Sequence, residues 1–261
     1  MRIEFNGAIA LVTGAASGLG RAAAVLLHQN GARVAGADRD MRGLEELSRE
    51  TGGAIVELDV CRDDEIEAGI AHIEETLGPI DILVTAAGIL QRPRAPDALP
   101  MAEWDRVLAT NLRGTYRCCA VAGARMAKRG AGAIVTVSSV MGATPGPVHA
   151  YGPAKAAIMN LTQSLAAEWA TRGVRVNGVA PGFVATPAIR RAAAFQFVNE
   201  DRLAEAHAQR RLVTAEEVAQ AIAFLASDLA SGITGVTLPV DGGYLAAAGW
   251  RGFDAAGPQE R

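Results

Sequence analysis

The stretch LVTGAASGLGRAAAVLL, residues 11–27, decides the fold that this 261-residue chain is expected to adopt. An apolar run at 8–14 predicts a buried strand, and the alanine- and leucine-rich segment that follows predicts a helix. Gly14, Gly18 and Gly20 stand where the strand must turn sharply into the helix. Glycines at such a turn let the backbone approach a pyrophosphate, to which the helix N-terminus offers unpaired N–H groups.

Taken alone, this turn is weak support for a nucleotide site. Its spacing, Gly-x-x-x-Gly-x-Gly, differs from the commoner Gly-x-Gly-x-x-Gly pattern, and tight packing of a helix on a strand also needs glycine. Its position directly after the first strand of an alternating chain favours a nucleotide over simple packing.

Short apolar runs alternate with helix-length segments along the rest of the chain. Strands are expected at 8–14, 33–38, 54–60, 80–88, 133–139, 175–182 and 236–243, and helices at 18–30, 63–77, 102–129, 153–171 and 215–227. This alternation predicts an α/β, Rossmann-like doubly wound fold, with a mostly parallel seven-stranded sheet and helices on both faces. A single domain is expected over residues 1–245, with an inserted lid at about 184–212 and a C-terminal tail at 246–261.

Composition excludes several classes of protein. Half of the residues (50%) are hydrophobic and 20% are charged, which indicates a compact globular chain. The net charge of -3 leaves no basic surplus for nucleic acid. No stretch is long enough to span a membrane, and the first residues lack a signal-peptide run, so a cytoplasmic protein is expected. Cys61, Cys118 and Cys119 have no metal-ligand spacing, so no metal site is expected.

Asp38, at the end of the second strand, bears on the type of nucleotide. A carboxylate there can accept hydrogen bonds from the ribose hydroxyls and would repel a 2′-phosphate. The alternative is an ordinary turn residue, and the neighbouring Arg39 could instead hold that phosphate. Because the glycine turn carries no basic residue to assist Arg39, NAD is expected rather than NADP.

Several further motifs follow in a fixed order. These are the turn at 13–20, Asp59 after the third strand, Asn111 in NLRG, SSVMG at 138–142, YGPAK at 151–155, PGFVAT at 181–186 and DGGY at 241–244. In this combination the chain resembles the short-chain dehydrogenase/reductase family from about residue 6 to 245. One departure is TAAG at 85–88, where the family usually has paired asparagines.

The resemblance implies an NAD site and an assembly. The implied cofactor-binding residues are Gly14, Ser17, Gly18, Leu19, Gly20, Asp38, Arg39, Asp59, Val60, Ala87, Gly88, Tyr151, Lys155, Pro181, Gly182, Val184 and Thr186. It also implies a homotetramer or homodimer formed through the helices near 102–129 and 153–171, with whose surfaces Trp104 and Trp169 are compatible.

Tyr151 and Lys155 are implied to carry the proton chemistry. Free tyrosine titrates near 10, too high for a base at neutral pH. A lysine four residues along the same helix face, together with the positive charge of an oxidised nicotinamide, would favour the phenolate. Pro153 fits the first turn of that helix and places Tyr151 just ahead of it. The resemblance also implies that Lys155 binds the ribose of the nicotinamide.

A serine and an asparagine complete the implied catalytic set. Ser138 stands the family's usual thirteen residues before Tyr151, whereas Ser139 has the family's glycine three residues later. Strand phase favours Ser139, because loops lose residues more easily than strands change face. Asn111 is implied to open its helix locally and to hold a water that links Lys155 to solvent; the alternative is a buried asparagine that satisfies backbone groups.

Residues that select a substrate are harder to identify. His149 could line a pocket or simply occupy a polar loop, and Met141 and Val148 could form the pocket wall or pack in the core. Four arginines flank the lid and could attract an anionic substrate, although a solvated helix face is the commoner reason for such charges: Arg190, Arg191, Arg210 and Arg211. Trp250 and Phe253 in the tail are candidates for a subunit contact or for a neighbouring active site.

Three functions remain in competition. The first is transfer of a hydride between NAD(H) and a secondary alcohol or ketone, such as a sugar or polyol, with Tyr151 as proton donor and acceptor. The second is reduction of a 3-oxoacyl thioester with NADPH, against which Asp38 argues. The third is a catalytically silent protein that senses NAD(H), against which the complete catalytic set argues.

Overall fold

A computed structural model describes residues 3–247 of the chain, in which seven strands form a single sheet of order β3-β2-β1-β4-β5-β6-β7. Every neighbouring pair is parallel, so the predicted α/β fold is confirmed and the sheet is wholly rather than mostly parallel. The strands are β1 (Ile9–Thr13), β2 (Arg33–Asp38), β3 (Ala54–Glu57), β4 (Ile82–Thr85), β5 (Gly132–Val137), β6 (Val174–Pro181) and β7 (Thr237–Val240).

The strand order reverses next to β1, which pairs with β2 on one side and with β4 on the other. The crevice outside the carboxyl ends of the strands at such a reversal is where open α/β sheets bind ligands. The glycine turn leaves β1 at this point, and the segment 86–91 leaves β4 beside it. The topology therefore brings the predicted site residues to one edge of the sheet.

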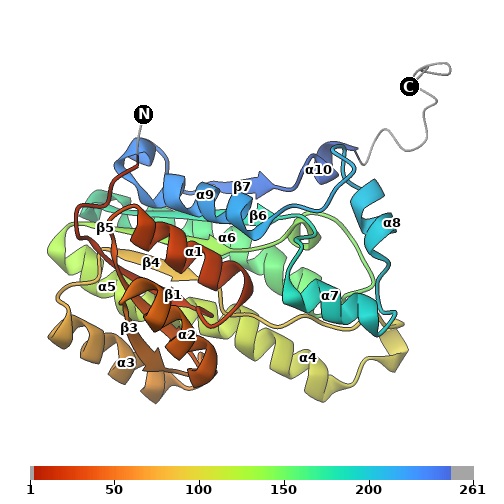
Figure 1. Cartoon of the computed structure of the whole chain (residues 1–261), viewed down its shortest axis with the longest axis horizontal. Helices are drawn as coiled ribbons and strands as arrows, with labels where there is room; N and C mark the ends of the chain where they lie inside the picture. Colours follow the sequence, from red (N-terminus) through yellow and green to blue (C-terminus); the bar gives the residue numbers. More distant parts are fainter. Residues whose placement is uncertain (1–2, 248–261) are drawn as a thin grey trace.

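Helices cover both faces of the sheet (Figure 1). One face carries α1 (Gly18–Gln29), α2 (Met41–Thr51) and α9 (Ala215–Ala226), and the other carries α3 (Asp63–Thr76), α5 (Thr115–Arg129) and α6 (Tyr151–Trp169). The remaining helices are α4 (Met101–Leu108), α7 (Pro187–Ala194), α8 (Glu200–Glu205) and α10 (Tyr244–Ala247). Short turns complete the list: η1 (Pro96–Ala98), η2 (Ala109–Gly114), η3 (Val140–Gly142), η4 (Ala170–Arg172) and η5 (Asp228–Ala230).

A hydrophobic core lies on each face of the sheet. This explains why the strands show no alternation of polar and apolar residues. All five residues of β1 are buried, because helices pack on both sides of it. Close packing of α5 on α6 depends on Gly123, where a Cβ atom would lie 2.2 Å from the Trp169 ring. Trp169 is thus part of this core, and the prediction that it contributes to a subunit surface is wrong.

Several predicted boundaries shift. The expected helix at 102–129 is divided by the π-helical turn η2, in which Asn111 lies. The strands expected at 54–60, 80–88 and 236–243 are shorter, since their ends turn into the site loops. The lid predicted at about 184–212 holds two helices, α7 and α8, which lie together at one end of the molecule (Figure 1).

Two findings concern the classes excluded by composition. Within residues 3–247, no helix has both the length and the apolar character that a membrane span requires. Cys118 and Cys119 are buried in the core and Cys61 is half-buried, and all three are free thiols. Of the tail at 246–261, the part from 248 onward, with Trp250 and Phe253, lies outside the described residues.

Candidate active site

The glycine turn has the shape that its sequence predicts. Gly14 and Gly18 have φ angles of +71° and +57°, which side-chain-bearing residues rarely adopt. At Gly20 a Cβ atom would lie 2.2 Å from the Gly14 carbonyl oxygen, so only glycine lets α1 begin so close to β1. A Cβ atom at Gly18, in contrast, would meet nothing within 4 Å. The N-terminus of α1 therefore faces open space, as a site for a phosphate requires.

Asp38 lies against this turn. Its Oδ2 accepts a hydrogen bond from the Ala16 amide at 3.2 Å, and its Oδ1 accepts one from the Asp40 amide at 3.1 Å. The carboxylate is partly exposed, so its remaining lone pairs are open to a hydroxyl. Arg39 is exposed beside it. A negative charge is thus fixed at the rim of the turn, where an adenosine ribose would lie.

Other predicted cofactor residues line the same edge of the sheet. Ser17 precedes the first residue of α1 without capping it by its side chain, and Leu19 is half-buried in the first turn. Asp59 and Val60 follow β3, where the Asp59 carboxylate accepts from the Cys61 amide at 2.9 Å. Ala87 and Gly88 follow β4, and the Ala87 amide donates to the Thr13 hydroxyl at 3.3 Å. These segments, together with the glycine turn, fit a dinucleotide.

Tyr151, Ser139 and Lys155 come together at the start of α6. The Tyr151 hydroxyl is hydrogen-bonded to the side chain of Ser139. Lys155 is 5% exposed, lies with its Nζ 5.6 Å from the centre of the Tyr151 ring, and donates to the Val137 carbonyl at 2.8 Å. Tyr151 is the first residue of the helix rather than a residue ahead of it, and Pro153 is the third.

Burial opposes ionisation of both groups. It raises the pKa of Tyr151 above its usual value, and the hydrogen bond from Ser139 counteracts only part of this rise. It lowers the pKa of Lys155 to about 8. The chain alone therefore does not favour the phenolate, and the lowering of the pKa of Tyr151 remains a prediction for the cofactor complex.

The two adjacent serines point to different partners. The Ser138 hydroxyl donates to the Lys155 carbonyl at 2.7 Å and is buried behind α6. The Ser139 hydroxyl instead accepts from the Met141 amide at 3.2 Å and meets the Tyr151 phenol. Only Ser139 stands on the tyrosine's side of the strand end, which is the geometry expected of the serine that orients a substrate oxygen.

Asn111 is fully buried and clamps the segment after β4. Its Oδ1 accepts from the Ile89 amide at 2.8 Å, and its Nδ2 donates to the Ile89 carbonyl at 2.9 Å. A Cβ atom at Gly88 would lie 3.2 Å from Asn111 Oδ1 and 3.8 Å from Lys155 Nζ, so both side chains flank this glycine. The side chain of Asn111, within the π-helical turn, thus holds the backbone groups of Ile89.

The segment after β6 leads into the lid. Pro181 ends the strand, and the Gly182 amide donates to the Val240 carbonyl at 3.0 Å. Val184 is buried and bridges Val213, while Thr186 caps α7 through its hydroxyl. Thr186 is therefore already engaged by the Ile189 amide at 3.4 Å.

Two buried side chains in the site region escaped the sequence analysis. His207, 1% exposed, accepts from the Phe183 amide through Nε2 at 3.2 Å. Gln91, 5% exposed, accepts from the amides of Ala150 and Tyr151. Neither lies in a motif, and their partners stand 24 to 60 positions away, so no local pattern could have identified them.

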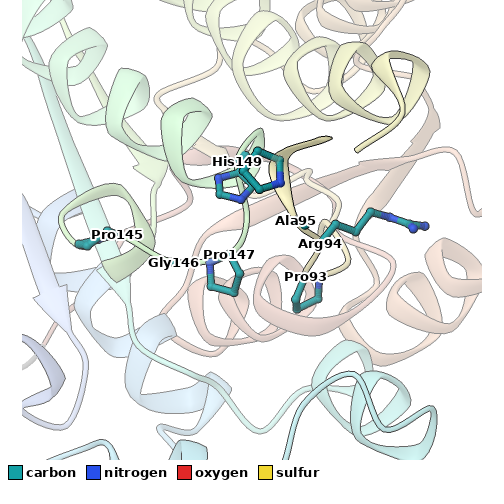
Figure 2. Close-up of a pocket in the computed structure, with 8 residues that line it drawn as sticks. Pro93, Arg94, Ala95, Pro145, Gly146, Pro147 and His149 are labelled. Atoms are coloured by element: carbon teal, nitrogen blue, oxygen red, sulfur yellow. The ribbon is translucent and has the colours of Figure 1, made fainter. Parts of the chain in front are cut away.

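A cavity of about 710 Å³ opens beside His149, one of the residues that could line a substrate pocket. Figure 2 shows Pro147 and His149 of one loop facing Pro93 and Ala95 of another, whereas the Arg94 side chain extends away from His149. Arg94 pairs with Glu103 at 3.3 Å. Of the four lid arginines, Arg211 pairs with Glu217 at 2.7 Å, and the others are exposed. Among the described residues, no three His, Cys, Asp or Glu side chains gather as a metal site.

Comparison with known families gives one match over most of the chain. The family profile described as enoyl-(acyl carrier protein) reductase matches residues 14–245. Among curated relatives, cis-4-hydroxycyclohexanecarboxylate dehydrogenase of Sinomonas cyclohexanicum is 42% identical over 91% of this chain and 96% of its own. D-threitol dehydrogenase of Mycolicibacterium smegmatis is 38% identical over 92% and 94%. The 3-oxoacyl-[acyl-carrier-protein] reductase of Salmonella typhimurium is 40% identical over 92% and 98%.

Solved structures share the fold over the same length. A crystal structure described as ribose-5-phosphate isomerase from Brucella melitensis 16M superposes with a TM-score of 0.94, at 51% identity over 95% of this chain and 96% of that one. ElxO with NADP bound superposes with a TM-score of 0.87, at 30% identity over 92% and 99%. The relatives therefore agree on the fold and differ in the substrates and cofactors that their names give.

Proposed function

The chain belongs to the short-chain dehydrogenase/reductase family, and we propose that it transfers a hydride between NAD(H) and a secondary alcohol or its ketone. The observation that carries this proposal is the placing of Tyr151, Ser139 and Lys155 beside the glycine turn at one sheet edge. A dinucleotide turn alone would serve a binding protein. A tyrosine hydrogen-bonded to a serine at the same edge serves proton transfer.

Tyr151 moves the proton. In alcohol oxidation its phenolate takes the hydroxyl proton, and in ketone reduction its phenol returns it. Ser139 donates to the substrate oxygen and stabilises the charge that develops there. Lys155, held by Val137, brings a positive charge to within 5.6 Å of the phenol ring and so favours the phenolate.

The cofactor is proposed to be NAD. When bound, a nicotinamide dinucleotide supplies the carbon that accepts or donates the hydride. The N-terminus of α1 would hold its pyrophosphate, and Asp38 would accept from its ribose hydroxyls. The fixed charge of Asp38 disfavours the 2′-phosphate of NADP, although ElxO shows that NADP occurs among structural relatives.

The substrate is proposed to be a small cyclic or polyhydroxylated alcohol. The relatives named for cis-4-hydroxycyclohexanecarboxylate and D-threitol support this class. The main alternative is reduction of a 3-oxoacyl thioester with NADPH, which the relative from Salmonella typhimurium favours. We further propose that the enzyme works in the cytoplasm, as a homotetramer or homodimer, without nucleic-acid or membrane partners.

A substrate panel with both cofactors tests this proposal. Polyols, sugars, hydroxycyclohexanecarboxylates and a 3-oxoacyl thioester are offered, and formation or consumption of the reduced nicotinamide is followed. Ribose 5-phosphate is included without cofactor, because net isomerisation would support the function for which the Brucella protein is named. We expect NAD-dependent oxidation of a cyclic alcohol or polyol.

The Tyr151→Phe variant is the matched control. Its turnover should fall by about 100- to 10,000-fold, the range that general acid–base catalysis contributes, while its NADH binding stays unchanged. Full turnover in this variant would contradict the mechanism. Tight NADH binding by the wild type with no turnover on any substrate would favour a sensing protein instead.

A further inference from the structure

The helix that carries Tyr151 begins without a cap of its own. Ala150 occupies the capping position and makes no side-chain hydrogen bond, because alanine has no acceptor. The first turn of any helix leaves backbone N–H groups that need partners from elsewhere. At the start of α6, one of these unpaired N–H groups belongs to Tyr151 itself.

Gln91 supplies the missing acceptor from the segment after β4. Its Oε1 accepts from the Ala150 amide at 2.7 Å and from the Tyr151 amide at 3.0 Å. The other groups of the turn are accounted for, since the Gly152 amide donates to Val148 at 2.8 Å and Pro153 has no N–H. One side-chain atom thus holds both amides at the point where the tyrosine joins the helix.

Gln91 is itself held in place. Residues 88–94, which we term the strap, run from β4 past η2 to the start of α6. Asn111 fixes the strap at Ile89 by two hydrogen bonds, of 2.8 and 2.9 Å. At its far end the Arg94 amide donates to the Pro147 carbonyl at 3.2 Å. Gln91 lies between these two attachments, so the backbone from which its side chain extends is held in place.

The carboxamide makes these bonds at a cost. Gln91 Nε2 is buried and has no hydrogen-bond partner in the described part of the chain. A flip of the carboxamide that exchanged Oε1 and Nε2 would not relieve this, because the Ala150 and Tyr151 amides would then face the Nε2 donor. A side chain that only filled space would leave no buried donor unsatisfied. The acceptor role toward α6 therefore accounts for the orientation of Gln91.

We propose that Gln91 is a positioning residue for Tyr151, whose backbone it fixes relative to the strap, so that the phenol leaves α6 toward Ser139. The proposal rests on the proposed function of Tyr151 in proton transfer. It also connects Asn111 to that function, because Asn111 holds Ile89 of the strap and Gln91 of the same strap holds the backbone of Tyr151. Displacement of a reacting group by about 1 Å can cost on the order of 100-fold in rate.

Two substitutions separate this role from simple packing. Gln91→Met keeps the shape and removes the acceptor, so kcat should fall by about 10- to 100-fold while KM for NAD and binding of NADH change less than about twofold. Gln91→Glu keeps the acceptor and adds a negative charge beside the backbone amide of Tyr151. Its kcat at the optimum should stay near that of the wild type, with the pH–rate profile moved upward by roughly half a unit or more. Gln220→Met, on the exposed face of α9, is the matched control.

A measurement without substrate keeps this test independent of the proposed function. The chain has three tyrosines, so ring-carbon NMR of labelled tyrosine gives three signals, of which the Tyr151→Phe variant identifies one. Gln91→Met should shift the Tyr151 signal, and Gln91→Glu should move its titration to higher pH. Absence of wild-type turnover with these NMR effects present would defeat the proposed function and leave the positioning role standing.

Opposite results would overturn the role of Gln91. These are wild-type kcat in Gln91→Met, or a Gln91→Glu variant that is as slow as Gln91→Met at every pH. If Gln91→Met does not fold, as judged by loss of NADH binding, the decision falls to Gln91→Glu. An unshifted pH profile and an unshifted Tyr151 titration in that variant would then count against the proposal.

Discussion

Lys155 is buried and Tyr151 is half-buried where the two side chains lie together, and this governs what each can do. Lys155 is buried, which lowers its pKa to about 8, and burial of the Tyr151 phenol raises its pKa. Each group is therefore pushed toward its neutral form. With a pKa of about 8, Lys155 still carries most of its positive charge at neutral pH. The positive charge of an oxidised nicotinamide is expected to favour the phenolate further, so the site is expected to work as a unit with its cofactor.

The Lys155→Met variant tests the burial of the ammonium through stability. In the folded chain the lysine loses its proton near pH 8, and in the unfolded chain near 10.5. Between these values the unfolded state binds more protons, so Lys155 contributes stability that rises with pH, by up to about 3 kcal/mol. Urea unfolding at several pH values should show this rise in the wild type relative to Lys155→Met. Parallel curves for the two proteins would mean that the ammonium is well solvated.

Asp38 is expected to set the choice of cofactor. Its replacement by serine removes the charge that would face a 2′-phosphate, while a hydroxyl remains for the ribose. Because like charges in contact cost several kcal/mol, the ratio of kcat/KM for NADP over NAD should rise by about 10- to 100-fold. Steady-state kinetics with both cofactors measure this ratio. A wild type that already prefers NADP would refute the assignment before any variant is made.

Among the elements, the base of the lid depends on His207. Its Nε2 accepts from the Phe183 amide, so the ring proton is on Nδ1, which donates to the Leu203 carbonyl at 2.7 Å. Phe183, His207 and Tyr244 pack edge to face or tilted around this bond. The histidine thereby joins the end of α8 to the segment that carries Val184 and Thr186, which are expected to contact the nicotinamide.

A pair of substitutions at His207 separates these contacts. Gln can place its Oε1 where Nε2 now accepts, whereas the shorter Asn reaches only the position of Nδ1. His207→Asn should raise KM for NAD by about 5- to 10-fold, the value of one lost buried hydrogen bond, and His207→Gln should raise it less. Equal KM values in both variants and the wild type would show that the lid base does not influence cofactor binding.

The elements that the sequence predicted are those with a local cause. The buried strands and the glycine turn follow from residues that are close in the chain, whereas the opening of the helix at Asn111 was implied by the family resemblance. The strap and the lid base do not, because Gln91 and His207 act on partners in other segments. Some strands were predicted to be longer than they are, because buried apolar residues such as Val60 follow the last residue that pairs with a neighbouring strand.

At the scale of the whole molecule, one surface groove is in the place expected for a subunit contact. It has a volume of about 660 Å³ and lies between α4, η2, α5 and α6. Leu108, Leu112 and Leu161 line it, together with Tyr116, which is 47% exposed. The family resemblance implies assembly through these helices. Their surface at the groove is thus apolar and includes the half-exposed ring of Tyr116.

The mass in solution tests this surface. We expect light scattering to give about four times the chain mass of 27.0 kDa, or twice that mass for a dimer. Tyr116→Arg should shift the protein toward a smaller species, because it places a charge in the groove. Met101→Arg, at a residue that is 64% exposed and lies outside the groove, is the matched control. A monomeric wild type would contradict the proposed assembly.

The central claim is that a hydride leaves the carbinol carbon of a secondary alcohol while Tyr151 takes the hydroxyl proton. The most direct test uses a substrate from the panel that carries deuterium on its carbinol carbon, incubated with NAD and the purified chain. We predict that mass spectrometry finds the deuterium in the reduced cofactor with the wild type, and at least about 100-fold less of it with Tyr151→Phe in the same time. Product formed without deuterium in the cofactor, or equal transfer by the variant, would contradict the account.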